Sequence, residues 1–246
     1  MNTKSELIVA LDGLADREHE TLCLAEQLAE SPSEFGFKGN IDYFLEKGWE
    51  AGLKRLQRIC SSRNLFVDLK LLNGSRTIRS VIERLIDRCV SYVSVAALAD
   101  EELQEALAVA NGTSTKVLAL TVMTHFDESY CKRHFRRSLR ETVQHFSETA
   151  RDRGCDGIIV PGTMLSEVKD LPLLKVVSGI RPKWFKDYRH SQEIEPRVAV
   201  EQGADILVCG SPIVKTERPR ESLEKILSEM EQALSYTQYR DELKSG

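Results

Sequence analysis

The sequence predicts a single (β/α)8 barrel, and three observations carry this prediction. Eight short apolar runs alternate with stretches whose apolar residues recur every three or four positions, which is typical of helices. The apolar runs are nearly continuous, as in parallel strands that are covered on both faces. The 246 residues contain no linker rich in Pro, Gly or Ser, and one barrel needs about 250 residues. We therefore expect one domain over 1–246, ending in a polar tail from about 237.

The strands are expected where β-branched and other apolar residues gather between turn signals. In order they are "ELIVALD" (6–12), "FGFK" (35–38), "LFVDLK" (65–70), "YVSVAAL" (92–98), "KVLALTVM" (116–123), "GIIV" (157–160), "LKVVSG" (174–179) and "DILVCG" (205–210). An open, doubly wound sheet is the alternative. The first turn, "LDGLAD", holds a single Gly and lacks the glycine-rich fingerprint that dinucleotide-binding sheets carry there.

Helices are expected between these strands because apolar residues return with helical spacing. The expected segments are 15–30, 43–60, 76–90, 100–110, 137–154, 195–203 and 219–236, with a short crossover over 163–172. Pro196 suits the first position of its helix, and Gly203 follows the end of that helix. The basic stretch 131–140 is interpreted as the polar start of the helix over 137–154.

Composition argues against several classes of protein. The net charge is −4 and the basic residues are dispersed, so we expect no nucleic-acid partner. None of the six cysteines forms a C-x-x-C pair, which indicates reduced, buried thiols. No apolar run approaches the roughly 18 residues of a membrane span, and the start of the chain does not resemble a signal peptide. We expect a soluble cytoplasmic protein without a membrane partner.

Polar residues gather where the expected strands end. In a (β/α)8 barrel these ends form the mouth in which active sites lie. The candidates are Asp12, Lys38, Asp68, Lys70 and the pair Thr124 and His125.

Asp68 and Lys70 share one strand face because side chains alternate with period two, about 7 Å apart at Cβ. Lys38 on the neighbouring strand would complete a Lys–Asp–Lys row. A carboxylate between two ammonium groups stays ionised and fixes the direction of their protons. The row is suited to protonating a carbanion, and a structural ion pair at the barrel mouth is the other interpretation.

Two strands end in glycine turns, "SGIRP" (178–182) and "CGSP" (209–212). Glycine allows close approach of the backbone to an anion, and barrel enzymes often bind phosphate after strands 7 and 8. Phosphate contacts are therefore expected from Gly179, Ile180, Arg181, Gly210 and Ser211. Two ordinary turns are the alternative.

The connection over 183–195 is the longest late in the chain. It carries His190 together with Trp184, Phe185 and Tyr188. A loop of this kind is expected either to act as a lid over the mouth or to pack as an aromatic cluster or at a dimer interface.

These motifs together resemble orotidine 5′-monophosphate decarboxylase, particularly its bacterial branch. "FVDLKLLN" (66–73) is similar to that family's D-x-K-x-x-D strand, and "LALTVMTHFDES" (118–129) to its fifth strand. "SGIRP" and "GADILVCGSPI" (203–213) follow in the family's order. The resemblance implies a homodimeric barrel with shared active sites that decarboxylates a nucleotide monophosphate without a metal or organic cofactor.

The resemblance also implies roles for single residues. Asp12 would hold ribose, and Lys70 would be the proton donor in a row with Lys38 and Asp68. Thr77 would reach the partner's site. Thr124 would lie at the pyrimidine, and the Gly179 and Gly210 turns would hold phosphate.

Five positions depart from the family's pattern. Asn73 stands where the family has a second Asp, which is supplied across the dimer, and Ala96 stands where the bacterial branch has a His. Ser211 replaces the phosphate-binding Arg. His190 and Gln192 stand in place of a Gln and an Arg of the lid.

The departures leave three functions open. The first is a decarboxylase of pyrimidine nucleotides with an altered site, in which Lys70 protonates the product. The second is a metal-dependent enzyme of phosphosugars, although Lys38 stands where such enzymes need an acidic ligand. The third is a barrel that binds a phosphate ligand without chemistry.

Overall fold

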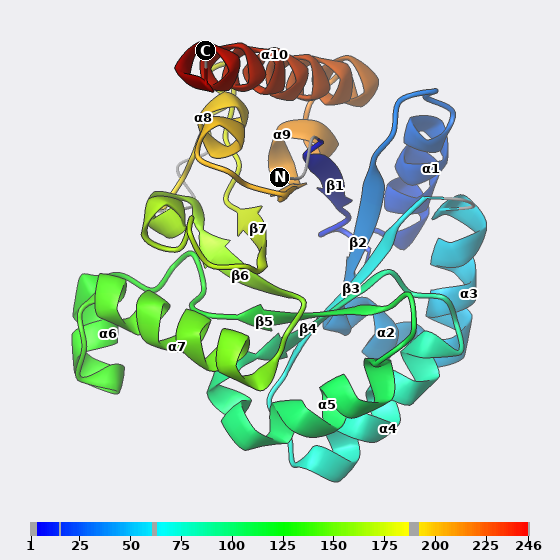
Figure 1. The fold of residues 1–246 in the computed structure, drawn as a ribbon. Coiled ribbons are helices and arrows are strands. Elements are labelled where there is room, and N and C mark those ends of the chain that lie inside the picture. The colour runs from blue at the N-terminus through cyan, green and yellow to red at the C-terminus, as the bar shows by residue number, and fades with distance from the viewer. Residues whose placement is uncertain (1–3, 15, 61–62, 187–191, 246) are drawn as a thin grey trace.

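The computed structural model describes residues 4–14, 16–60, 63–186 and 192–245. Eight parallel strands close into one barrel in chain order, as the sequence predicted (Figure 1). They are β1 (Glu6–Ala10), β2 (Gly36–Asn40), β3 (Leu65–Leu71), β4 (Tyr92–Ala96), β5 (Lys116–Leu120), β6 (Gly157–Pro161), β7 (Leu174–Ser178) and β8 (Ile206–Cys209). The expected (β/α)8 fold is confirmed.

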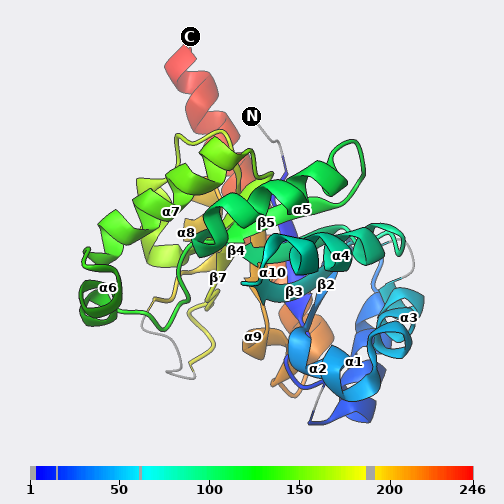
Figure 2. The same cartoon turned by 90° about the horizontal axis from the view of Figure 1, so that it is seen from below.

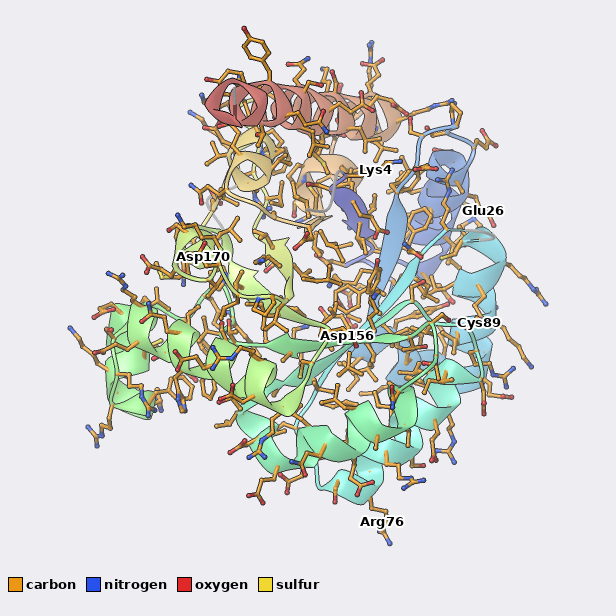
Figure 3. The ribbon with its side chains drawn as sticks, viewed as in Figure 1. Lys4, Glu26, Arg76, Cys89, Asp156 and Asp170 are labelled. Carbon is orange, nitrogen blue, oxygen red and sulfur yellow. The ribbon has the colours of Figure 1, made fainter. Side chains whose placement is uncertain are left out.

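The strands are buried on both faces, which explains their continuous apolar character. One set of side chains fills the barrel, including Ile8, Phe66, Leu118 and Val208. The other set packs outward against the helices. Charged side chains such as Glu26, Arg76 and Asp170 lie at the periphery (Figure 3).

Helices surround the sheet as the periodicity predicted. They are α1 (Glu18–Ala29), α2 (Ile41–Lys47), α3 (Trp49–Cys60), α4 (Ser75–Ile86), α5 (Leu103–Ala110), α6 (Glu128–Phe135), α7 (Leu139–Arg153), α8 (Pro196–Glu201), α9 (Ser211–Val214) and α10 (Pro219–Ser245). Two 3-10 segments, η1 (Ala97–Glu102) and η2 (Gly162–Glu167), follow β4 and β6. Pro196 begins α8 and Gly203, with φ of 90°, follows it, as expected.

The single helix expected over 43–60 is wrong. Gly48 has φ of 76°, outside the helical region, and it separates α2 from α3. Because glycine adopts this conformation without a Cβ penalty, the chain turns there although the apolar spacing continues on both sides. After this break, α2 and α3 each pack against β2 and β3.

The basic stretch 131–140 also differs from the prediction. Its first half, 131–135, belongs to a separate helix, α6, which Arg136 caps in the left-handed conformation with φ of 58°. Helix α7 then begins with a capping box, in which Ser138 and Glu141 exchange hydrogen bonds with each other's backbone.

The chain remains helical to Ser245, whereas its polarity favoured a loose tail from about 237. Residues 237–245 contain neither Gly nor Pro, so nothing in the local sequence ends the helix there. Helix α10 packs across α8 (Figure 1).

The mouth of the barrel lies where the carboxyl ends of the strands meet. In Figure 2 the segments that leave these ends, α2, α6 and α9, lie on the lower side of the molecule. At the opposite, amino-terminal end, Glu6 accepts hydrogen bonds from the Tyr92 hydroxyl (2.7 Å) and the Asn64 amide (2.8 Å). The Tyr92 ring packs edge-on against Phe66 inside the barrel.

Cys60, Cys131, Cys155 and Cys209 are buried free thiols, whereas Cys89 is exposed. The expectation of buried thiols is therefore confirmed for four of the six cysteines. Among the described residues, no helix is long and apolar enough to cross a membrane.

Candidate active site

The expected charged row is present at the carboxyl ends of β2 and β3. One carboxylate oxygen of Asp68, Oδ2, lies 2.7 Å from Lys70 Nζ and 3.1 Å from Lys38 Nζ. Lys38 and Asp68 are almost fully buried, while about a third of the Lys70 side chain is exposed. The two ammonium groups therefore converge on one oxygen atom, with Lys70 on the side of solvent.

The row continues through a residue that the sequence reasoning missed. Asn40 at the end of β2 accepts a hydrogen bond from Lys38 Nζ at 2.5 Å. Its amide nitrogen donates to Asp12 Oδ1 at 3.1 Å, and Lys38 Nζ lies 3.6 Å from the same oxygen. Asn40 thus links the row to Asp12 on the neighbouring connection. The available signal was its spacing of two from Lys38, which places both side chains on one strand face.

A second missed residue is Ser94 in the middle of β4. Its hydroxyl donates to the other carboxylate oxygen, Asp68 Oδ1, at 2.6 Å. It also accepts the backbone N–H of Lys70 at 2.8 Å. A buried hydroxyl in the otherwise apolar centre of "YVSVA" was the only signal in the sequence.

The charges stabilise one another. Burial alone would raise the pKa of Asp68, but the ammonium groups of Lys38 and Lys70 hold that pKa well below its usual range. Burial alone would lower the pKa of Lys38, and the carboxylates of Asp68 and Asp12 raise it above its ordinary value instead. At neutral pH the row therefore holds the ionised carboxylate of Asp68 beside the protonated ammonium group of Lys38.

A cavity of about 550 Å³ opens over this row at the barrel mouth. It is lined by ten of the predicted site residues: Asp12, Lys38, Asp68, Lys70, Thr124, His125, Gly179, Arg181, Gly210 and Ser211. The charged row from β2 and β3 and the glycine turns after β7 and β8 therefore face one space. Apolar side chains from inside the barrel, such as Phe66 and Leu120, form its base.

At both turns the structure explains why the residue is glycine. Gly179 has φ of 80°, and a Cβ there would lie 2.9 Å from the Gln192 carbonyl oxygen. At Gly210 a Cβ would lie 3.0 Å from Asp12 Oδ2. A side chain at Gly179 would therefore press on Gln192, and one at Gly210 would press on Asp12.

Arg181 is the buried cation of this wall. Its side chain is 7% exposed, and one guanidinium nitrogen donates to the Ile180 carbonyl at 2.9 Å. The Arg181 Nε atom lies 3.7 Å from Glu193. Lys183, in contrast, is 82% exposed on its side chain, pairs with Glu195 and does not line the cavity.

Four predicted site residues are not among those that line the cavity. Asn73 and Thr77, after β3 and in the first turn of α4, are exposed at the surface of this chain. The Ile180 side chain is fully buried in the core. His190 lies outside the described residues.

The described parts of the connection 183–195 are anchored. Gln192 is buried: it accepts a hydrogen bond from Thr163 at 2.8 Å and donates one to the Phe126 carbonyl. Trp184 donates to Glu229 of α10 at 3.0 Å, which agrees with the packing interpretation for this aromatic residue. Residues 187–191, including Tyr188, lie outside the described part, so the lid remains a prediction.

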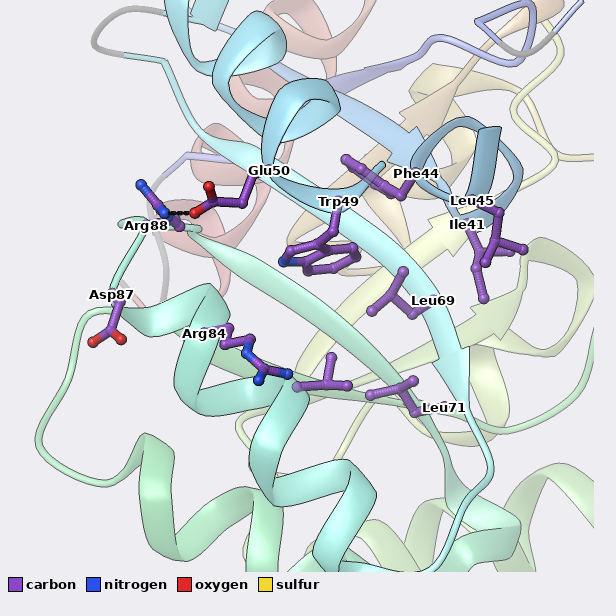
Figure 4. A pocket seen from close by; sticks show the side chains of 11 residues that line it. Ile41, Phe44, Leu45, Trp49, Glu50, Leu69, Leu71, Arg84, Asp87 and Arg88 are labelled. Atoms are coloured by element: carbon purple, nitrogen blue, oxygen red, sulfur yellow. Dashed lines mark hydrogen bonds and ion pairs between the residues drawn. The ribbon is translucent and has the colours of Figure 1, made fainter. Parts of the chain in front are cut away.

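A larger hollow lies on the outside of the barrel between α3 and α4 (Figure 4). It measures about 730 Å³ and is lined mainly by apolar side chains such as Phe44, Trp49 and Leu69. Arg88 and Glu50 pair at its edge. It has neither the buried carboxylate nor the glycine turns of the mouth, so chemistry favours the smaller cavity as the active site.

The described residues contain no group of three or more His, Cys, Asp or Glu side chains that could hold a metal ion. The polar groups of the cavity are instead ammonium, guanidinium, hydroxyl and paired carboxylate groups. They are suited to contacts with an anion and to proton transfer.

Comparison with known proteins agrees with the geometry. Residues 5–226 match the family described as "Orotidine 5'-phosphate decarboxylase / HUMPS family". Two relatives are named orotidine 5'-phosphate decarboxylase. The one from Dictyoglomus turgidum is 31% identical, covering 92% of this chain and 95% of its own. The one from Carboxydothermus hydrogenoformans is 29% identical, covering 93% of this chain and 97% of its own.

Among solved structures, orotidine 5'-phosphate decarboxylase from Lactobacillus acidophilus has the same fold, with a TM-score of 0.75 and 23% sequence identity. The match covers 92% of this chain and 99% of that one.

Proposed function

Because the chain belongs to the orotidine 5'-phosphate decarboxylase / HUMPS family, we propose that it is a carboxy-lyase that converts orotidine 5′-monophosphate to UMP. One observation carries the proposal: Lys38, Asp68 and Lys70 meet within hydrogen-bond distance at the base of the mouth cavity. The ~30% identical relatives that bear the decarboxylase name support it.

In the proposed reaction, the bond between the pyrimidine ring and its carboxylate breaks. The electron pair stays on the ring carbon, and carbon dioxide leaves. Lys70 Nζ then gives a proton to this carbon, which completes UMP and leaves a neutral amine. Because about a third of the Lys70 side chain is exposed, the amine can regain its proton from water.

Asp68 has two roles in this proposal. It keeps the ammonium of Lys70 directed into the cavity through the 2.7 Å contact. It also places a fixed negative charge near the substrate carboxylate. Like charges raise the energy of the bound substrate, and this repulsion disappears when carbon dioxide leaves.

The opposite wall of the cavity is the proposed phosphate site. Gly179 and Gly210 allow the backbone to approach an anion closely, and the Ser211 hydroxyl and the Arg181 guanidinium line the same wall. Ser211 stands where the family has an arginine. We therefore assign to Arg181 the pairing with phosphate that the family's arginine provides. Lys183 is a poorer candidate because it is exposed and paired with Glu195.

We also propose a homodimer with shared sites. Asn73 and Thr77 lie outside their own cavity and are exposed, as expected of residues that act on a partner's site. Three neighbouring connections leave large apolar side chains uncovered: Leu45 is 77% exposed, Leu72 55% and Leu98 53%. They follow β2, β3 and β4, and Leu72 is next to Asn73 in the chain. Covering them with a second copy would remove this apolar surface from water.

The test is the loss of orotidine 5′-monophosphate absorbance with purified protein and its Lys70→Ala variant. Lys169→Ala, a change at an exposed lysine outside the cavity, is the matched control. We expect turnover that Lys70→Ala reduces by at least about a thousandfold, because it removes the proton donor together with an electrostatic contact. Equal turnover in all three proteins would overturn the role of Lys70.

A second candidate function is nucleotide binding without turnover, favoured by Asn73 and Ser211. Asn73 removes one negative charge from the set that the family brings together, so a bound carboxylate would be repelled less. Calorimetric titration with UMP distinguishes the two functions: binding without any turnover at high protein concentration would favour the binding barrel.

A further inference from the structure

Strand β3 is irregular where it carries the charged row. It pairs with β4 at Val67↔Val93 and next at Leu71↔Val95. Between these pairs the chain advances four residues along β3 but only two along β4. Asp68, Leu69 and Lys70 therefore stand opposite a single residue of β4, which is Ser94.

The irregularity changes the backbone of Lys70. Its φ is 50°, in the left-handed region that side chains other than glycine seldom adopt. In a regular ladder the Lys70 N–H would donate to a carbonyl of the neighbouring strand. Here it donates to the side-chain oxygen of Ser94 at 2.8 Å. A conformation of this kind persists only when surrounding contacts impose it.

The Ser94 hydroxyl makes two hydrogen bonds, one as a donor and one as an acceptor. A hydroxyl has one proton, and this proton goes to Asp68 Oδ1 at 2.6 Å, while a lone pair accepts the Lys70 N–H. Ser94 is fully buried, so water does not compete for these bonds. One small side chain therefore fixes the rotamer of the carboxylate and the backbone of the lysine.

We propose that Ser94 is the positioning residue that aims the Lys70 ammonium at the reacting carbon. The inference rests on the proposed decarboxylation. Ser94 is not among the residues that line the cavity, so it acts through Asp68 and Lys70 and not on the substrate. It holds the left-handed conformation within β3 that accompanies the contact of Lys70 Nζ with Asp68 Oδ2.

This role predicts a particular kinetic change. Ser94→Ala leaves the Lys70 N–H without its acceptor and frees one oxygen of Asp68. A displacement of about 1 Å at a reacting group can cost about a hundredfold in rate. We expect kcat to fall between tenfold and a hundredfold, while KM changes less than threefold, because the turns after β7 and β8 are untouched.

Two variants serve as comparisons. Ser94→Thr keeps the hydroxyl and should recover most of the lost kcat. Ser147→Ala removes another fully buried serine hydroxyl, on α7 and away from the cavity, and should leave kcat and KM unchanged. The Ser147 hydroxyl has no hydrogen-bond partner within the described structure, so its loss disturbs no network.

Hydrogen exchange of the Lys70 amide, followed by NMR on the full chain, supplies a readout independent of turnover. Ser94→Ala should speed this exchange at least tenfold relative to wild type and to Ser147→Ala. The Val93 amide serves as an internal reference for global opening. Faster exchange together with a fall in kcat supports the proposal.

Unchanged exchange in Ser94→Ala would overturn it, and so would a rise in KM without a fall in kcat. If the wild-type chain shows no turnover, the proposed function fails separately. The geometric claim about Ser94 is then still decided by the exchange of the Lys70 amide.

Discussion

Neutralising Asp68 is the most informative single change in this protein. Asp68→Asn keeps the shape of the side chain and can still accept the Ser94 hydroxyl. It removes the charge toward which two ammonium nitrogens point, at 3.1 Å from Lys38 and 2.7 Å from Lys70. The variant therefore separates the effect of charge from that of packing.

The expected loss follows from burial. Removing one member of a buried ion pair costs about 3–5 kcal/mol, because the other charge stays buried without its partner. Lys38, with its side chain 9% exposed, would lose its nearer carboxylate and keep only the more distant Asp12 at 3.6 Å, so we take the lower end of this range. Lys70 can turn toward water, so its contribution is small. We expect the free energy of unfolding at pH 7 to fall by about 3 kcal/mol.

The pH dependence has a definite sign. The pKa of Asp68 is lowered in the folded chain from an ordinary value of 3.8. Its stabilisation is therefore complete well above pH 3.8 and is lost as the pH falls toward the folded pKa. Below the ordinary value, wild type should lose about 1.4 kcal/mol per pH unit relative to Asp68→Asn.

Urea unfolding between pH 7 and pH 2.5 measures this difference. Asp205→Asn is the matched control, because Asp205 accepts the Lys175 backbone N–H at 2.8 Å at the amino-terminal end of the barrel, and Asn can keep this bond. A difference below about 1 kcal/mol at pH 7 would refute the reasoning. A difference that stays constant down to pH 2.5 would refute the assigned pKa shift.

Three further predictions concern phosphate, backbone and thiols. Ser211→Arg should lower KM for orotidine 5′-monophosphate about tenfold, since a charge-assisted hydrogen bond contributes about 1.5–3 kcal/mol; an unchanged KM would show that this wall does not hold phosphate. Gly48→Ala should cost about 1–2 kcal/mol in urea unfolding because φ is 76° in open space, whereas Gly74→Ala, equally open but with φ of −62°, should cost almost nothing. Equal losses would contradict a conformational cause. A thiol reagent should modify exposed Cys89 quickly and Cys155 only on unfolding, because burial raises the pKa of Cys155 to about 12; equal rates of labelling would contradict the packing.

Much of the fold could be predicted because parallel strands that are buried on both faces appear in the sequence as nearly continuous apolar runs. The run "GIIV", for example, coincides with β6 within one residue. Helix breaks were less visible: the spacing of apolar residues continues through Gly48, and only the backbone conformation shows that α2 and α3 are separate.

The charged row could be predicted for a similar reason, since Asp68 and Lys70 sit two apart on one strand. Asn40 has the same spacing of two from Lys38, whereas Ser94 could not be predicted, because its contacts depend on the register between β3 and β4. The residue types of β3 give no signal for the irregular pairing that accompanies the positive φ of Lys70. A period of two explains which side chains share a face, but not where a strand departs from that period.

In the described part of the chain, Tyr92 and Asn64 converge on Glu6 at the amino-terminal end of the barrel, while the cavity over the charged row opens at the mouth. A ligand as large as a nucleotide must then leave along the route by which it came. Product that lingers blocks the next substrate directly, so inhibition by UMP should be purely competitive. Under the proposed function, the apolar side chains at the base of the cavity would also shield the pyrimidine ring from bulk water on one side. Substrate and product would then share the mouth as their common route.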